Sequence, residues 1–144
     1  MSHGLGMTVF LLPEEQVAYI VTPNRVLFSI ADFNIKEWTR TLTEVEKMDF
    51  QTEIYSHSHA KEPFGTKSAV TQTREFIEEL QVAIVEEFKK GTSFYQVPNA
   101  VKLPKYEHWD LYNEWLPLNV WKMMLSMEMG PFPWRPEPDN EATQ

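Results

Sequence analysis

The chain has 144 residues, of which 42% are hydrophobic and 24% charged, and it carries a net charge of −8 and no cysteine. This length matches one domain, so two full domains are not expected. The absence of cysteine excludes disulfides, iron–sulfur clusters, thiolate zinc sites and cysteine nucleophiles. A reducing compartment suits such a chain, so we expect a cytoplasmic protein, or a virion-associated one if the source is a phage.

The charge distribution disfavours general nucleic-acid binding, which depends on clustered lysine and arginine. The 13 basic residues are scattered, and Lys89-Lys90 is the only adjacent pair. The apolar stretches are too short for a membrane span. The first residues, Met1-Ser2-His3-Gly4, lack the basic region and apolar run of a secretory signal. We therefore expect neither a membrane span nor a nucleic-acid partner.

The N-terminal third predicts strands, because β-branched and aromatic residues dominate it. We expect strands over residues 7–12, 16–21 and 25–30. The segment Thr22-Pro23-Asn24-Arg25 has the chemistry of a type I turn, so the second and third strands should form a hairpin. Residues 49–56 alternate and predict a further strand, with Phe50, Thr52 and Ile54 on one face and Gln51, Glu53 and Tyr55 on the other.

Two helices are predicted from apolar stripes with helical spacing. The first begins near Asn34, a candidate N-cap, and carries Ile35, Trp38, Leu42 and Val45 on one face. Its threonines lower helix propensity, and a strand over 38–43 is the competing interpretation. The segment 60–67 is expected to be a loop, because it contains Pro63 and Gly65.

The second and clearest helix runs from Ser68 to Lys90. Ile77, Leu80 and Ile84 should lie in the core, with Glu75 and Glu79 on the exposed face. Lys89-Lys90 before Gly91 suits the C-terminal end of a helix.

The C-terminal third predicts an extended connector over 92–105 and helical structure over 107–129, divided by Pro117 into two short helices. Four prolines follow Gly130, so residues 130–144 should form an extended tail. Together these features predict an α+β fold. A small antiparallel sheet, made of an N-terminal hairpin and one or two further strands, would pack against a long central helix and a C-terminal helix pair. The domain would span 1–129.

Histidine supplies the one candidate metal site. His57 and His59 are two residues apart in a strand-like segment and could reach one ion, with Glu62 as a carboxylate ligand. The fragment resembles the His-x-His element of cupins. Cupins are all-β proteins, whereas this chain should be about half helical, so the resemblance implies no family membership. Two exposed histidines in a polar loop are the competing interpretation, and no cofactor is expected.

Other catalytic patterns are missing from the sequence. It has no Gly-x-Ser-x-Gly elbow, no Gly-x-Gly-x-x-Gly loop and no Walker A pattern. The adjacent carboxylates Glu78-Glu79 and Glu86-Glu87 would diverge by about 100° on a helix, so neither pair converges on one bond.

Large aromatic and methionine side chains gather in the C-terminal part. Four of the five tryptophans and four of the seven methionines follow residue 108. Both residue types are over-represented at interfaces, because they provide large and adaptable contact areas. We expect Trp115, Trp121, Met124 and Trp134 to contact a partner. The competing interpretation places this segment in the ordinary core.

These observations favour a non-enzymatic, acidic interaction subunit or accessory factor of phage or bacterial origin. It would bind a protein partner, or a second copy of itself, through the aromatic and methionine-rich C-terminal part. The alternative is a metal-dependent enzyme that uses His57, His59 and a nearby carboxylate.

Overall fold

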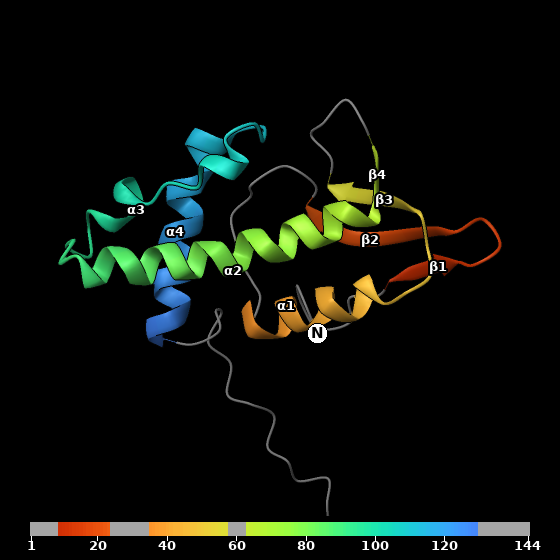
Figure 1. Cartoon of the computed structure of the whole chain (residues 1–144), viewed down its shortest axis with the longest axis horizontal. Helices are drawn as coiled ribbons and strands as arrows, with labels where there is room; N and C mark the ends of the chain where they lie inside the picture. Colours follow the sequence, from red (N-terminus) through yellow and green to blue (C-terminus); the bar gives the residue numbers. More distant parts are fainter. Residues whose placement is uncertain (1–8, 24–34, 58–62, 130–144) are drawn as a thin grey trace, which may run out of the picture.

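The computed structural model describes residues 9–23, 35–57 and 63–129. It has an α+β fold, as predicted, in which a sheet occupies one end and helices the other (Figure 1). The elements in chain order are β1 (Phe10–Leu12), β2 (Val17–Pro23), α1 (Ile35–Glu46), β3 (Thr52–His57), β4 (Phe64–Thr66), α2 (Lys67–Lys89), α3 (Val97–Ala100), the 3-10 helix η1 (Pro104–Tyr106) and α4 (Tyr112–Met129).

The sheet has strand order β1-β2-β3-β4 and is mixed rather than purely antiparallel. β1 with β2 and β3 with β4 are antiparallel, but β2 and β3 are parallel. The parallel pair arises because α1 lies between these two strands in the chain and provides the crossover that parallel neighbours need. The prediction of an antiparallel sheet was therefore wrong for the central pair.

The observed N-terminal hairpin joins β1 to β2, through a turn in which Gln16 N donates to Pro13 O at 3.3 Å. Gln16 has φ of +54° and its carbonyl accepts hydrogen bonds from the amides of Gln51 and Thr52. The turn thus links β2 to the start of β3. The hairpin predicted between 16–21 and 25–30 depends on residues 24–30, which lie outside the described residues.

Both helices predicted from apolar stripes are present. In α1 the residues Trp38, Leu42 and Val45 are buried, which excludes the competing strand over 38–43. In α2 the residues Ile77, Leu80 and Ile84 are buried, as predicted. Both helices contribute side chains to one core with Ala18 and Ile20 of β2, and they cover one face of the sheet (Figure 1).

Three predictions about irregular segments were wrong. Residues 64–66 form β4 instead of a loop, because Gly65 lets this strand pass close to Tyr55. The connector 92–105 contains two short helices, α3 and η1, and each has a proline at its first turn, where a missing amide donor costs nothing. Pro117 does not divide α4, because it removes a single bond near the start of the helix, and buried side chains on both sides of it anchor the helix.

The helical end of the core is built around an aromatic cluster. The rings of Phe76, Tyr106 and Trp109 contact one another, with centroids 4.7–5.3 Å apart. Buried side chains of α4, including Val120 and Met123, complete this end. The predicted tail 130–144 lies outside the described residues.

Candidate functional site

α4 positions the candidate interaction surface because it is apolar on two opposite sides. Its buried side carries Leu116, Val120, Met123 and Met124. At the helical spacing of 100° per residue, Leu118, Trp121 and Leu125 lie together on the opposite side. Leu118 and Leu125 are exposed and Trp121 is partly buried. A helix that is apolar all round is typical of a fully buried position, yet one side of α4 is open.

An aromatic cluster extends this open side of α4 toward the end of α2. The ring of Trp121 lies 5.4 Å from that of Phe94 and 6.1 Å from that of Tyr95, and the ring of Phe88 lies 6.4 Å from that of Phe94. Tyr95 is 79% exposed although its ring is held by two neighbours. We call these residues the α4 surface, defined as Phe88, Phe94, Tyr95, Leu118, Trp121 and Leu125.

The charges next to the α4 surface are largely paired within the chain. Lys89 contacts Glu86 at 2.7 Å and Lys90 contacts Glu87 at 2.6 Å, at the C-terminal end of α2. The hydrogen bonds from Lys90 and Thr92 lower the pKa of Glu87 below its usual value. The exposed side chains of Lys89, Glu86 and Lys90 therefore form a charged border beside the apolar side chains of the α4 surface.

The four residues predicted to contact a partner occupy different environments. Trp115 and Trp121 are both partly buried and packed against the core, and Trp121 also contacts the rings of Phe94 and Tyr95 in the α4 surface. Met124 is only 2% exposed, so it is a core residue and we leave it out of the surface. Trp134 lies outside the described residues. Phe94 and Tyr95 were not predicted as contact residues. The sequence does show them as adjacent aromatic residues that closely follow the predicted end of the central helix.

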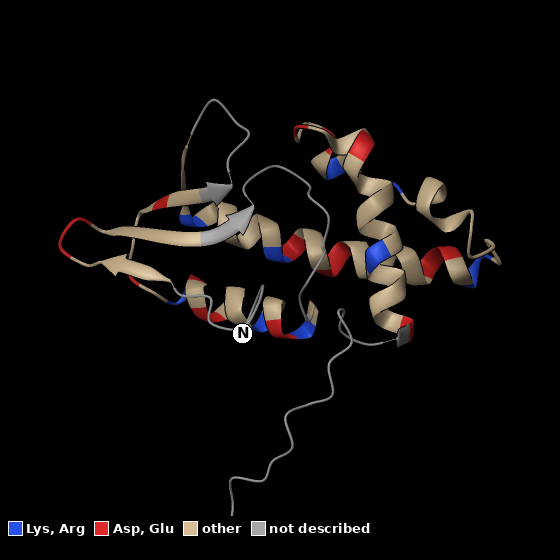
Figure 2. Cartoon of the chain, turned by 180° about the vertical axis from the view of Figure 1, so that it is seen from behind, with Lys and Arg blue, Asp and Glu red and all other residues tan. Residues whose placement is uncertain are grey.

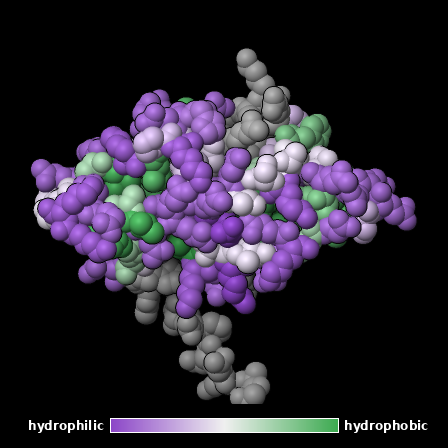
Figure 3. All heavy atoms as spheres, in the orientation of Figure 1, coloured by the Kyte–Doolittle hydropathy of each residue, from purple (hydrophilic) through white to green (hydrophobic). Residues whose placement is uncertain are grey.

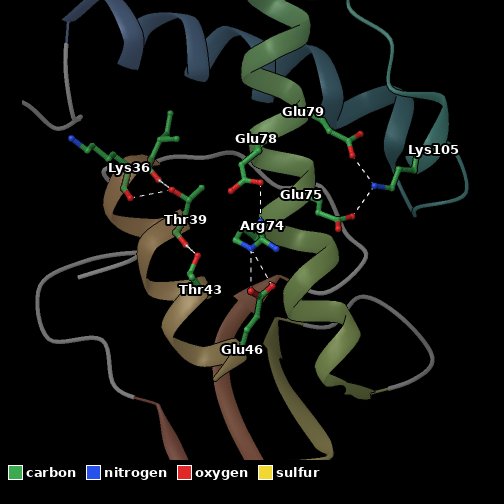
Figure 4. Close-up of polar contacts among 10 residues, drawn as sticks. Lys36, Thr39, Thr43, Glu46, Arg74, Glu75, Glu78, Glu79 and Lys105 are labelled. Atoms are coloured by element: carbon green, nitrogen blue, oxygen red, sulfur yellow. Dashed lines mark hydrogen bonds and ion pairs between the residues drawn. The ribbon is translucent and has the colours of Figure 1, made fainter. Parts of the chain in front are cut away.

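A groove of about 340 Å³ separates α1, α2 and α4 on another part of the helical end. It is lined by Ile35, Lys36, Thr39, Glu78, Gln81, Met123, Ser126 and Met127. The Thr39 hydroxyl donates to the backbone carbonyls of Ile35 and Lys36 (Figure 4), so its proton is not directed to a base. The remaining polar lining consists of the charged side chains of Lys36 and Glu78 and the uncharged side chains of Gln81 and Ser126.

Two charged clusters on α2 connect it to its neighbours (Figure 4). Arg74 contacts Glu46 at the end of α1 and Glu78 one turn along α2. Lys105 of η1 contacts Glu75 and Glu79, at 2.7 Å each. Hydrogen bonds to these two carboxylates raise the pKa of Lys105. In each cluster one cation contacts two carboxylates, and the contacts link α2 to α1 through Arg74 and to η1 through Lys105.

The candidate metal ligands are not placed by the structure. His57 ends β3, but its side chain is not described, and His59 and Glu62 lie outside the described residues. In the part of the chain that the structure covers, no group of three or more histidine, aspartate or glutamate side chains is close enough to hold a metal ion. The metal site remains a prediction.

No protein-family model matches the chain, and no curated protein matches its sequence. Within 9–23, 35–57 and 63–129, no helix is long and apolar enough to cross a membrane.

Proposed function

We propose that the chain is a non-enzymatic interaction subunit or accessory factor that binds a second protein through the α4 surface. The observation that supports this proposal is the apolar side of α4 formed by Leu118, Trp121 and Leu125, which lies opposite a side already buried in the core. Leaving such side chains in water forfeits roughly 25 cal/mol for each Å² of apolar surface, so covering them favours association.

The chemistry of the chain defines the partner. The α4 surface offers aromatic rings held by their neighbours, which give contact area at low entropic cost. The net charge of −8 attracts a basic surface from a distance and accelerates encounter. We therefore propose a partner protein with an apolar centre and basic surroundings. The phage or bacterial origin, and the cytoplasmic or virion-associated location, stay predictions from the sequence.

The test compares two double variants that each remove two exposed apolar side chains. Leu118→Ser with Leu125→Ser alters the α4 surface, whereas Phe10→Ser with Phe64→Ser alters the sheet at the other end and serves as the matched control. The tagged chain and both variants are used to purify partners from the native source, with quantitative mass spectrometry. Circular dichroism and thermal unfolding establish that each variant is folded.

We expect the wild type and the sheet variant to retain the same basic protein and the α4 variant to lose it. With purified components, the α4 variant should bind at least about tenfold more weakly, the effect of removing contacts near the centre of an interface. Equal retention by all three proteins would place the partner contact elsewhere. The absence of any specific partner would overturn the proposal.

The second candidate function is a metal-dependent enzyme that uses His57, His59 and Glu62. The observation that favours it is the spacing of the two histidines in and just after β3. Elemental analysis of purified protein, alongside His57→Ala with His59→Ala, tests it. Near-stoichiometric iron or zinc that disappears in the double variant would favour the enzyme over the interaction subunit.

A further inference from the structure

The outer face of the sheet carries an apolar row that crosses all four strands. Phe10 is paired with Tyr19, Tyr19 with Ile54, and Ile54 with Phe64, so these side chains lie next to one another on one face. The rings of Phe10 and Tyr19 have centroids 6.1 Å apart. The opposite face carries Ala18 and Glu53, which are buried beneath the helices.

This outer face is open to solvent. Phe10 is 61%, Tyr19 36% and Phe64 58% exposed. In Figure 2 the strands lie in front of α2, α1 lies below them in the view, and none of the described helices covers their near side. The row therefore lies on the surface, at the other end of the molecule from α4 (Figure 1).

A second row of side chains, beside the first on the same face, also contains no charged residue. Leu12 is paired with Val17, Val17 with Thr52, and Thr52 with Thr66, and all are at least partly exposed. We call the two rows the outer sheet face, defined as Phe10, Leu12, Val17, Tyr19, Thr52, Ile54, Phe64 and Thr66. None of these residues is ionisable at neutral pH, in a chain of which 24% is charged. Figure 3, which views the molecule from the side opposite to Figure 2, shows a mostly hydrophilic surface with separate hydrophobic patches.

We propose that the outer sheet face binds the same face of a second copy of this chain, in a two-fold symmetric dimer. This inference goes beyond the proposed function, because it concerns a different surface. The charges favour a second copy of the chain as the partner of this face. Two chains of net charge −8 repel each other, and contact through an uncharged face places no like charges next to one another. A basic partner would find no carboxylate on this face to pair with.

The geometry and area of the outer sheet face suit such a dimer. When the strands of the two copies are antiparallel, two-fold symmetry places the first row of each copy against the second row of the other, as in sheet-on-sheet packing. At about 200 Å² for a large aromatic side chain, the three rings expose roughly 300 Å² in each chain. Two copies would bury roughly 600 Å² of ring surface, close to the apolar share of the smallest specific interfaces. In this arrangement the acidic turns that contain Glu14 and Glu15 lie at opposite ends of the dimer interface, so the like charges of the two copies are kept apart.

The first test measures the oligomeric state by sedimentation equilibrium over a range of concentrations. We expect the wild type to dimerise and Phe10→Ser with Phe64→Ser to raise the dissociation constant at least about tenfold. Leu118→Ser with Leu125→Ser should dimerise like the wild type. A wild type that remains monomeric, or a dimer lost only in the α4 variant, would overturn this proposal and leave the partner experiment unaffected.

The second test does not depend on removing side chains from the interface. Because the chain has no cysteine, a single introduced thiol reports on proximity between copies. Thr52 lies on a central strand of the outer sheet face, and Thr43 is an exposed residue of α1 on the helical side. Under mild oxidation Thr52→Cys should form a disulfide-linked dimer much faster than Thr43→Cys. Equal rates would contradict face-to-face packing.

Discussion

The Nε atom of Arg74 lies 3.1 Å from one carboxylate oxygen of Glu46 and 3.2 Å from the other. This contact joins the last residue of α1 to the N-terminal third of α2, and both side chains are partly buried. Burial alone would lower the pKa of Arg74, but hydrogen bonds to Glu46 and Glu78 outweigh it and raise the pKa.

Neutralising Glu46 should therefore destabilise the packing of α1 on α2. We expect Glu46→Gln to lower the free energy of unfolding by about 1.5–3 kcal/mol, as for a hydrogen bond to a charged group. Glu44→Gln is the matched control, because its pair with Lys47 is exposed and should contribute less than about 1 kcal/mol. Urea unfolding of both variants measures the difference, and equal losses would contradict the assigned role of Arg74.

Two neighbouring residues of α2 should respond very differently to truncation. Leu80 is fully buried, so Leu80→Ala should cost about 2–5 kcal/mol of unfolding free energy. Glu79 is partly exposed and shares Lys105 with Glu75, so Glu79→Ala should cost less than about 1 kcal/mol. Chemical denaturation compares the two. Similar losses would mean that the orientation of α2 is wrong.

Alkaline pH should destabilise the fold through Tyr106. Burial raises the pKa of this tyrosine from its ordinary value of 10.0 to about 12. The folded state then keeps a proton that the unfolded state loses, so the stabilisation is complete below pH 10 and disappears as the pH rises to 12. Burial also raises the pKa of Tyr112, which acts with the same sign.

We expect the free energy of unfolding to fall over this alkaline window and to fall less steeply in Tyr106→Phe. Denaturation curves at several pH values measure the slope, and ultraviolet absorbance follows tyrosine ionisation directly. Tyr95→Phe is the control, because Tyr95 is exposed. If Tyr95→Phe and Tyr106→Phe changed the slope equally, burial of Tyr106 would not be the cause.

Gly65 should accept no side chain while Tyr55 lies beside it. A Cβ atom at position 65 would overlap the Oη and Cζ atoms of Tyr55. We expect Gly65→Ala to destabilise the protein by about 1–3 kcal/mol, the cost of overpacking. In a Tyr55→Leu background the clash is removed, so the added cost of Gly65→Ala should shrink. A double-mutant cycle by thermal unfolding measures this coupling, and strictly additive effects would contradict it.

Local sequence patterns predicted the long elements of this fold well. Trp38, Leu42 and Val45 define α1, and Leu80 and Ile84 define α2, because each stripe is buried against a single core. The parallel pairing of β2 with β3 could not be predicted, because strand order depends on where α1 packs and not on any local pattern. β4 was missed because three residues containing a glycine carry no detectable alternation.

The candidate surfaces were predictable only in part. Trp121 and Leu125 stand out in the sequence because their spacing places them on one side of α4. The outer sheet face was not predicted, because its rows combine single residues from four separate strands. Phe10 and Phe64 come from strands of three residues, and only the register of the sheet brings them into one row with Tyr19 and Ile54.

The edge position of β1 has a consequence for handling the protein. β1 is short, apolar and exposed, and it is an edge strand of the sheet formed by the described residues, where such an edge offers backbone groups to another chain. Glu14 and Glu15 follow β1 and Pro13 in an exposed turn, and their negative charges oppose the pairing of β1 with another chain. Their protection depends on the overall negative charge, which vanishes near the isoelectric point of about 5.0. Colloidal stability should therefore be lowest in mildly acidic buffers, where β1 becomes a nucleus for precipitation.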